Sequence, residues 1–227
     1  MNDLKKIPLH VAMIMDGNGR WAAAKGKDRV EGHIEGVRSI RVITEEAVKY
    51  GIRYVSFFAF SEENWARPEG EVSALMNLML KSVQEEVETL VRNNVRFKAI
   101  GNRERLPLPL QTAIGDLEKM TEFNTALTMS VFLSYSGKWD ISQAALKMAA
   151  AGDDDLEKYL STRGMPDPDL IIRTSGEQRI SNFLLWQAAY SEFVFTDTLW
   201  PDFREDGFRA ALEEYAGRDR RYGKVNY

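Results

Sequence analysis

The sequence predicts an α/β fold: a single domain with a mostly parallel six-stranded sheet flanked by helices. Short apolar runs of strand length alternate with longer segments of helical periodicity along the chain. The 227 residues, 44% hydrophobic and 28% charged, have the composition of an ordinary globular protein with a sizeable core. No internal repeat or low-complexity linker divides the chain, so we expect one domain over residues 1–227.

Six segments have the composition of strands. Residues 11–15 form a continuous apolar run, and residues 54–60 are aromatic and β-branched. The other four expected strands are residues 95–101, 127–135, 170–176 and 193–196. A helical segment lies between each strand and the next, which favours parallel pairing with helices on both faces of the sheet.

The helical segments are recognised by the spacing of their apolar residues. Residues 33–50 and 71–91 have this spacing most clearly, and the second carries a stripe of Met, Leu and Val on one face. The remaining helices are expected over 109–121, from Asp140, from Ser181 and up to about Arg221. The Met-rich stripe is by default core packing, with a lipid-lining surface as the alternative.

Composition excludes several classes of protein. A net charge of −4 and a pI of about 5.4 leave no basic surplus, so we expect no nucleic-acid partner. The absence of cysteine excludes disulfides, zinc–thiolate sites and cysteine nucleophiles, and suits a reducing cytoplasm. No segment resembles a signal peptide or a bilayer span. We therefore expect a cytoplasmic protein in which a few gathered arginines recognise any phosphate.

The stretch HVAMIMDGNGRWA, residues 10–22, has the pattern of an anion site. An apolar strand ends at Asp16, and Gly17 and Gly19 then permit positive φ and close backbone approach before a helix begins. Free N–H groups and a helix N-terminus favour a bound anion. Because Asp16 and Arg20 flank this place, we infer a metal ion between carboxylate and anion. A simple turn cap explains Asp16 equally well.

Polar clusters follow four of the expected strands: MDGNGR, FSEENWARP, SYSGKWD and RTSGEQRIS. Ligands bind at the carboxyl ends of parallel strands, so these clusters predict the mouth of the site. Arg173, Arg179 and Ser181 suit a second anion, because the planar guanidinium meets phosphate oxygens in pairs. Ser181 suits a helix N-cap equally well.

Two further features favour a ligand. Arg29 and His33 lie four residues apart, so they share a helix face and can grip a diphosphate from one side, although a lone histidine is usually a surface or core residue. Trp65, between Asn64 and Arg67 on a polar loop, is costly to expose and indicates a ligand or a second subunit.

The segments HVAMIMDGNGRWA, GHIEGV, FAFSEENWARP, IIRTSGEQRISNFLLWQAAYSEFVFTDTLWPDF and RRYG occur in this order between His10 and Gly223. They closely resemble the cis-prenyltransferase family, and within it the bacterial undecaprenyl diphosphate synthases. The resemblance implies repeated condensation of isopentenyl diphosphate onto an allylic diphosphate, usually farnesyl diphosphate, with each new double bond cis. The implied product is undecaprenyl diphosphate, the lipid carrier precursor for cell-wall synthesis.

The resemblance also implies a role for each matching residue. Asp16 would act through Mg²⁺ on departure of the diphosphate, Glu192 would help to hold the metal ion, and Asn64 would assist proton removal. Capping or a surface ion pair explains Glu192 equally well. The residues implied in substrate binding are Gly17, Asn18, Gly19, Arg20, Trp21, Arg29, His33, Ser61, Glu62, Glu63, Trp65, Arg67, Arg173, Arg179, Ile180 and Ser181.

Further expectations concern the product and the assembly. We expect the growing chain to lie in an apolar tunnel between the sheet and the helix over 71–91, with Leu127 as a candidate floor. The family is homodimeric, and transient contact of the lipid product with the inner face of the membrane is a hypothesis. SYSGK, residues 134–138, stands where the family commonly has Asn-Tyr-Gly-Gly-Arg, and we expect no metal or diphosphate residue there.

Three alternative functions are compatible with part of this sequence. A synthase of short or medium chains fits the same motifs. A non-catalytic accessory subunit fits less well, because residues such as Asp16, Asn64 and Arg173 are present. The residues alone also suggest a metal-dependent phosphotransferase or phosphatase. Two absences argue against it: the sequence has no GxxxxGK[ST] loop and no second aspartate two residues after Asp16.

Overall fold

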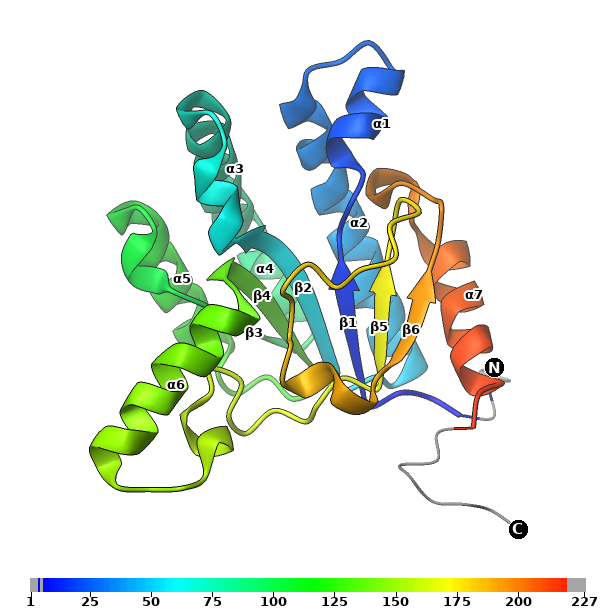
Figure 1. Cartoon of the computed structure of the whole chain (residues 1–227). Coiled ribbons are helices and arrows are strands. Elements are labelled where there is room, and N and C mark those ends of the chain that lie inside the picture. The colour runs from blue at the N-terminus through cyan, green and yellow to red at the C-terminus, as the bar shows by residue number, and fades with distance from the viewer. Residues whose placement is uncertain (1–3, 5, 220–227) are drawn as a thin grey trace.

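One parallel sheet organises the molecule (Figure 1). The computed structural model describes residue 4 and residues 6–219, and in it six strands pair in the order β3-β4-β2-β1-β5-β6, every pair parallel. The strands are β1 (His10–Ile14), β2 (Tyr54–Ser61), β3 (Val95–Ile100), β4 (Leu127–Tyr135), β5 (Leu170–Arg173) and β6 (Glu192–Phe195). The predicted α/β class and six-stranded sheet are confirmed.

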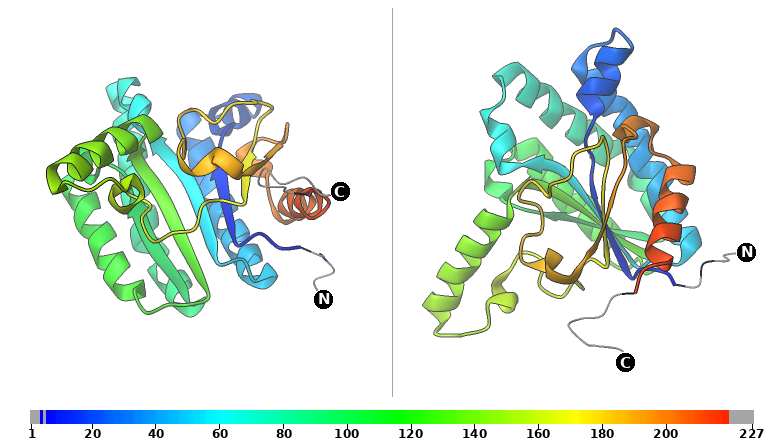
Figure 2. Two further views of the ribbon diagram at one scale, coloured as in Figure 1. Left: turned by 60° about the horizontal axis from the view of Figure 1, so that its bottom comes forward. Right: turned by 45° about the vertical axis from the view of Figure 1, so that its right-hand side comes forward.

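Helices cover both faces of this sheet (Figure 2). Side chains alternate along each strand, so Val11 and Met13 join the core under α2, α3, α4, α5 and α7, whereas Ala12 and Ile14 face the segment around Phe183 and the side of α6. The helices are α1 (Asn18–Ala24), α2 (Arg29–Tyr50), α3 (Glu69–Glu85), α4 (Val87–Arg92), α5 (Leu108–Thr121), α6 (Gly137–Ala151) and α7 (Glu205–Ala216).

Two predicted helices differ from the structure. The helix expected over 71–91 is two helices, α3 and α4, which meet at Glu86. The helix expected up to about Arg221 ends at Ala216, and the segment around residue 221 lies outside the described residues. Within the described ranges, no helix combines the length and apolar character of a membrane span. A single domain over residues 1–227 stays a prediction.

The helix expected from Ser181 does not form. Ser181, Asn182 and Leu184 have φ values of 49°, 65° and 48°, which belong to the left-handed region and interrupt a right-handed helix. Only a short 3₁₀ helix, Gln187–Tyr190, follows. The segment after β5 is therefore an irregular loop, and Ser181 is not a helix N-cap.

His10, the first residue of β1, is buried at the amino edge of the sheet. Its Nδ1 lies 2.7 Å from the carbonyl oxygen of Pro166, and its Nε2 lies 2.8 Å from Oγ of Ser56. Burial lowers the pKa of His10 to about 4, although the Pro166 carbonyl and the charge of Asp169 oppose the shift. The ring is therefore neutral at pH 7, donating to Pro166 and accepting from Ser56.

We predict that this buried histidine makes folding sensitive to acid. Its folded pKa lies below the unfolded value of 6.5, so the unfolded chain takes up the proton first as the pH falls. The free energy of unfolding should fall by about 3 kcal/mol from this group between pH 6.5 and pH 4. Urea unfolding of the wild type and of His10→Gln across this range measures the effect, and equal pH slopes in the two proteins would contradict it.

Candidate active site

The ends of β1, β2 and β5 meet at one edge of the sheet, at the top of Figure 1. Ile14, the last residue of β1, is in register with Arg173, the last residue of β5, and Asp16 follows two residues later. On the other side of β1, β2 ends at Ser61. The topology thus gathers Asp16, Ser61 and Arg173 from distant parts of the chain at the edge where parallel sheets bind ligands.

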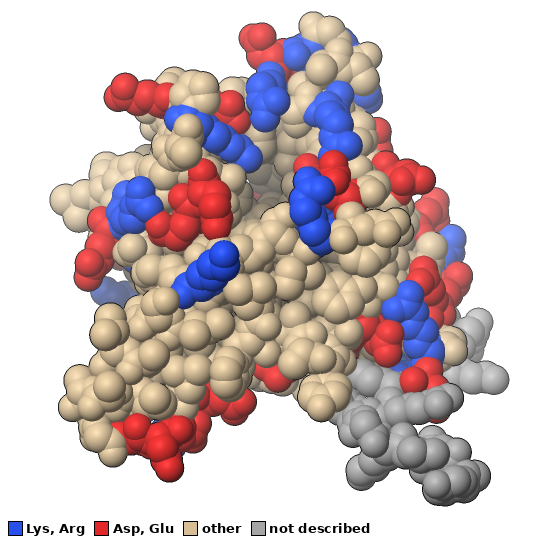
Figure 3. Space-filling view, in the orientation of Figure 1, with Lys and Arg blue, Asp and Glu red and all other residues tan. Residues whose placement is uncertain are grey.

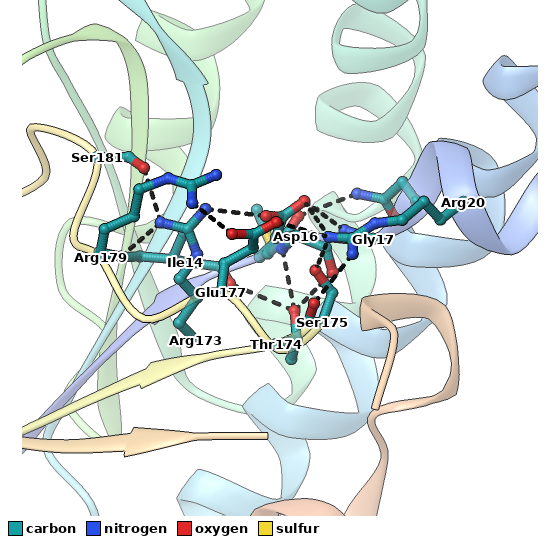
Figure 4. A network of polar contacts seen from close by, with 12 residues as sticks. Ile14, Asp16, Gly17, Arg20, Arg173, Thr174, Ser175, Glu177, Arg179 and Ser181 are labelled. Carbon is teal, nitrogen blue, oxygen red and sulfur yellow. Dashed lines mark hydrogen bonds and ion pairs between the residues drawn. The ribbon is translucent and has the colours of Figure 1, made fainter. Parts of the chain in front are cut away.

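An ion pair between Asp16 and Arg173 forms the centre of this edge (Figure 4). Nη2 of Arg173 donates to Oδ2 of Asp16 over 2.9 Å, while the backbone N–H of Gly17 donates to Oδ1 over 2.7 Å. Arg173 is 4% exposed and also donates to Oγ of Ser181 and to the carbonyl oxygen of Arg179. These bonds fix the orientation of the carboxylate.

The same contacts keep Asp16 ionised. Its partial burial alone would raise the pKa of the carboxyl. The hydrogen bond and charge of Arg173, the N–H of Gly17 and the charge of Arg20 outweigh burial and lower that pKa below its usual value. A carboxylate at a half-open edge with fixed orientation is a ligand that Mg²⁺ accepts.

Hydrogen bonds from Arg20 join the segment after β1 to the segment after β5. Gly17 has φ of 107°, and a Cβ there would lie 2.9 Å from Cδ2 of Leu199, so only glycine fits this turn. Arg20 of α1 donates through Nη1 to the carbonyl oxygen of Ser175 over 3.1 Å and through Nη2 to its hydroxyl, and its Nη2 lies 3.6 Å from Oδ1 of Asp16. The predicted turn therefore places an arginine directly beside the carboxylate.

A second group of charges lies between α2 and α3. Nη2 of Arg29 and Nη1 of Arg67 lie 3.5 Å and 3.2 Å from the same oxygen, Oε1 of Glu71. Burial and the charge of Arg67, with a further contribution from Arg29, lower the pKa of His33 to about 4 against the opposing charge of Glu71. His33 is consequently neutral at pH 7, and the two arginines share one carboxylate, which leaves positive charge for a ligand.

The segment after β2 forms a short 3₁₀ helix, Glu62–Ala66, with a reciprocal cap. Oδ1 of Asn64 accepts from the backbone N–H of Ser61 over 3.1 Å, and the Ser61 side chain in turn accepts from the backbone N–H of Asn64. Oε1 of Glu63 accepts from Nδ2 of Asn182 over 2.7 Å. The cap holds Asn64 at the edge of the site.

Trp65 is held by the protein itself, which the sequence did not predict. Its indole Nε1 donates to Oγ of Ser134 over 2.8 Å, its ring packs edge-on against Phe60, and the guanidinium of Arg105 lies 4.9 Å from the ring centroid. The Ser134 hydroxyl in turn donates to Glu62, which is ion-paired with Arg105. These contacts bury Trp65 only in part, so its contact with a ligand or a second subunit stays a prediction.

The segment of residues 134–138 lies next to the site, and the expectation that it holds no metal or diphosphate residue stays a prediction. Ser134 has φ of 50° and hydrogen-bonds to Trp65 and Glu62 of the segment after β2. Lys138 lines the cavity that opens from Asp16 between the sheet, α2 and α3. The departure from the family pattern therefore lies against the site. The position of the polar cluster SYSGKWD at a strand end was the sequence signal that this segment lies near the site. Lys138 was not predicted as a site residue, because it belongs to no recognisable motif.

The predicted site residues at and after the end of β5 differ in how closely they approach Asp16. Oγ of Ser181 accepts from Arg173, whereas the side chain of Arg179 is mostly exposed and ion-paired with Glu177. Ile180 packs with the hydrophobic cluster around Phe183. Arg173 is thus built into the site, and Arg179 stands at its rim.

Trp21 and Glu192 lie away from the carboxylate. Trp21 is buried and donates through Nε1 to Asp202 over 2.7 Å, so it joins α1 to the segment before α7. Glu192 begins β6 opposite Leu170, at the amino end of the sheet, where Nη1 of Arg218 donates to it over 3.0 Å. The structure therefore does not bring Asp16 and Glu192 of one chain together, because they lie at opposite ends of parallel strands.

A cavity of about 710 Å³ opens from the carboxylate between the sheet, α2 and α3. Its head is polar, and its body is lined by aliphatic and aromatic side chains of these three elements. Figure 3 shows charged side chains on both rims of the hollow between α3 and α1. Of the residues predicted to act in the site, the following line the cavity: Asp16, Asn18, His33, Ser61, Glu63, Asn64, Arg67, Arg173 and Ser181.

The remaining predicted residues lie outside the cavity wall or behind it. Gly17, Gly19, Arg20, Arg29 and Arg179 stand next to wall residues through the turn and the ion pairs described above. Glu62, Trp65, Trp21, Ile180 and Glu192 make protein contacts instead. Within the described ranges, no group of three or more His, Cys, Asp or Glu side chains could hold a metal ion.

The sequence has extensive similarity to a known family. A family model described as "Putative undecaprenyl diphosphate synthase" matches residues 14–223. An isoprenyl transferase of Chlorobaculum tepidum is 46% identical over 231 residues, covering 97% of this chain and 87% of the relative. A ditrans,polycis-undecaprenyl-diphosphate synthase ((2E,6E)-farnesyl-diphosphate specific) of Haemophilus influenzae is 46% identical over 232 residues, covering 97% of each chain.

Solved structures with the same fold agree. Lavandulyl diphosphate synthase from Lavandula x intermedia, in complex with dimethylallyl diphosphate, superposes with a TM-score of 0.93 at 38% identity, covering 96% of this chain and 99% of that one. A probable undecaprenyl diphosphate synthase from Campylobacter jejuni gives a TM-score of 0.82 at 32% identity, covering 99% and 100%.

We predict that Ser134 keeps the loop with Asn64 in place. In Ser134→Ala the Trp65 indole and Glu62 lose their shared partner, so amide hydrogen exchange over residues 62–66 should speed up about tenfold. Ser130→Ala, on the same strand and equally buried, is the matched control and should leave this exchange unchanged. Unchanged exchange in Ser134→Ala would show that the hydroxyl does not hold the loop.

Proposed function

The chain belongs to the undecaprenyl diphosphate synthase family, and we propose that the edge around Asp16 and the cavity behind it carry out the family's reaction. The protein is a cis-prenyltransferase that elongates an allylic diphosphate with isopentenyl units, and its named relatives make undecaprenyl diphosphate. The observation that carries the proposal is the division of one cavity into a charged head at Asp16 and Arg173 and an apolar body between the sheet, α2 and α3.

The charged head suits two diphosphates. Two such anions repel each other unless cations stand between them, and here five arginines gather in a protein of net charge −4. We propose that the turn of residues 17–20, with Arg29, His33 and Arg67, holds the allylic diphosphate. Arg173, Arg179 and Ser181 hold the isopentenyl diphosphate from the side of β5.

The apolar body suits the growing chain. Each five-carbon unit moved out of water contributes about 4 kcal/mol at about 0.8 kcal/mol per carbon. The cavity wall supplies Val37 and Ile40 from α2 and Leu75 and Met79 from α3. The Met-rich stripe, which core packing would also explain, therefore has a second use as the wall of the chain-binding cavity.

Asp16 fits a Mg²⁺ ion. Proteins hold this ion through one or two carboxylates plus substrate phosphates, and Asp16 offers an ionised, oriented carboxylate next to the proposed diphosphate sites. When bound, Mg²⁺ stabilises the negative charge that develops on the departing diphosphate. Glu192 of the same chain does not fit this site, because it pairs with Arg218 at the other end of the sheet.

Asn64 is proposed to assist proton removal. During condensation the allylic C–O bond breaks, a C–C bond forms to isopentenyl diphosphate, and a proton leaves a carbon beside the new bond. Oδ1 of Asn64 accepts from the N–H of Ser61, so the side-chain amide is fixed at the cavity wall with its N–H groups facing the other way. We propose that these N–H groups orient the diphosphate oxygen or water that takes the proton.

We further propose a homodimer. The lower part of the face in Figure 3, over α6 and the segment before β6, carries few charged side chains. Leu146, Trp186 and Tyr190 are exposed by 74%, 43% and 62%, and exposed apolar patches of this kind mark interaction surfaces. Peripheral contact with the inner face of the membrane through the lipid product, in an otherwise cytoplasmic protein, stays part of the proposal.

The proposed function predicts the result of a direct assay. Purified protein with farnesyl diphosphate, labelled isopentenyl diphosphate and Mg²⁺ should make a C55 diphosphate, and a chelator should abolish synthesis. Asp16→Ala should lower kcat at least about a hundredfold, because it removes charge stabilisation that acts in the transition state. Asp206→Ala on α7, an exposed carboxylate, is the control.

Three outcomes of this assay are distinct. A shorter main product would favour a synthase of short or medium chains, to which the similarity with lavandulyl diphosphate synthase gives weight. Absence of any product with several primers would favour the accessory-subunit alternative. Full activity in Asp16→Ala would show that the Asp16 carboxylate takes no part in the reaction.

We predict that substitutions of Arg173 and Arg179 change different kinetic constants. Arg179 stands at the rim, so Arg179→Gln should raise KM for isopentenyl diphosphate about tenfold with little change in kcat. Arg173 orients Asp16, so Arg173→Lys should lower kcat as well. Steady-state kinetics at fixed farnesyl diphosphate measures both, and identical profiles would contradict the distinction.

A further inference from the structure

The segment after β2 and the segment after β5 come from strands that are not neighbours in the sheet. Strand β1 lies between β2 and β5, so the two segments meet above its carboxyl end, next to Asp16. In Figure 1 the chain after β5 crosses β1 toward the start of α6. There Nδ2 of Asn182 donates a hydrogen bond to Oε1 of Glu63 over 2.7 Å, which joins the two segments. Both side chains line the cavity, and Asn182 was not among the predicted site residues.

The first turn of α6 holds Asn182 from the other side. The carbonyl oxygen of Asn182 accepts from the backbone N–H of Gly137 over 2.7 Å, and its Oδ1 accepts from the backbone N–H of Lys138 over 3.0 Å. A Cβ at residue 137 would lie 2.7 Å from Cγ of Leu185, so only glycine lets α6 come this close. Because Oδ1 faces α6, the NH₂ group of the same amide faces Glu63.

Asn182 directly follows a residue that is proposed to hold isopentenyl diphosphate. Oγ of Ser181 accepts from Nη1 of Arg173 over 2.7 Å, and Ser181 and Asn182 have φ values of 49° and 65°. Two successive left-handed residues that are not glycine keep this conformation only where surrounding contacts impose it. A diphosphate bound to Ser181 and Arg173 adds such a contact, so it fixes the peptide that positions the Asn182 side chain.

Glu63 passes this constraint to Asn64, its neighbour in the short helix after β2. Burial alone would raise the pKa of Glu63, but the hydrogen bonds that it accepts, first of all from Asn182, and the charge of Lys138 lower that pKa below its usual value. The carboxylate is therefore ionised at pH 7, and its bond to the Asn182 amide is charge-assisted. The bond lies at the exposed rim of the cavity, where water competes for both groups, so a ligand beside it can change how often it forms.

We infer that Asn182 is a positioning residue that links the proposed isopentenyl diphosphate site to Asn64. This inference rests on the proposed function. Isopentenyl diphosphate bound at Ser181 fixes the Asn182 side chain. The hydrogen bond to Glu63 then fixes the short helix of residues 62–66, and with it the side-chain amide of Asn64. The second substrate thereby completes the arrangement that later removes its own proton.

A change from amide to carboxylate at position 182 tests this link. Asn182→Asp keeps the shape of the side chain and can still accept from α6, but it places a second carboxylate at hydrogen-bond distance from Glu63. We expect kcat/KM for isopentenyl diphosphate to fall about tenfold, with KM for farnesyl diphosphate unchanged. Asn94→Asp is the matched control, because Asn94 has φ of 54°, accepts through Oδ1 from a backbone N–H 2.8 Å away and lies in the turn before β3. It should leave both constants unchanged.

Reversing the polarity of the hydrogen bond separates the link from a role of Asn182 within its own segment. Glu63→Gln supplies an amide that can donate to a carboxylate at position 182. In the Glu63→Gln background, Asn182→Asp should therefore lower kcat/KM for isopentenyl diphosphate by at most about twofold, against about tenfold in the wild-type background. An equal loss in the two backgrounds, or no loss in either, would overturn the inference.

Amide hydrogen exchange tests the link in the wild-type protein. Isopentenyl diphosphate added to the complex with farnesyl thiodiphosphate should slow exchange over residues 62–66 about fivefold, as well as over residues 177–181. In Asn182→Asp the same addition should protect residues 177–181 and leave residues 62–66 unprotected. Absence of protection over 62–66 in the wild type, or its persistence in the variant, would contradict the link.

The failure of the inference and that of the proposed function are distinguishable. Wild-type protein that elongates no primer refutes the proposed function. Wild-type protein that elongates farnesyl diphosphate, with equal kinetic losses in the two backgrounds or without protection over residues 62–66, refutes only the link through Asn182. Thermal unfolding of each variant shows whether the compared proteins are folded, and the exchange experiment on the wild type decides the question if Asn182→Asp does not fold.

Discussion

The ion pair between Asp16 and Arg173 joins the ends of two adjacent strands, and the arrangement of the site depends on it. Arg173 is almost fully buried, so its charge needs a partner, and Asp16 supplies one while keeping lone pairs for a metal ion. The same guanidinium binds Ser181 and the carbonyl oxygen of Arg179. One side chain thus fixes the carboxylate and the irregular loop after β5 together.

The rest of the molecule follows from two opposite requirements of the ligand. A diphosphate needs cations and hydrogen-bond donors, which the topology gathers at the carboxyl ends of β1, β2 and β5. A prenyl chain needs a dry apolar wall, which α2 and α3 supply below that edge. At the level of Arg41 and Glu86 the wall is mixed, because Val83 and Leu90 line it beside these two charged residues.

The sequence predicted the class of fold, the six strands and the edge that holds the site, because apolar periodicity and the polar strand ends are local signals. It could not show that Ser181, Asn182 and Leu184 adopt positive φ, since tertiary contacts impose that conformation. Nor could it show that Ser134 holds Trp65, because that contact depends on how the segment after β2 packs against the end of β4. The position of Glu192 at the amino end of the sheet, in contrast, was implied by the parallel strand expected directly after it. The break at Glu86 in the helix expected over 71–91 likewise has no glycine or proline beside it that would predict it.

The most direct test is a crystal structure of the protein with isopentenyl diphosphate, Mg²⁺ and farnesyl thiodiphosphate, an allylic analogue whose C–S bond resists cleavage. We predict that the analogue's diphosphate lies beside Asp16 and the turn of residues 17–20, that its isoprenoid tail lies between α2 and α3, and that the second diphosphate lies at Arg173. A tail lying outside the cavity, or a diphosphate bound away from Asp16, would contradict this prediction.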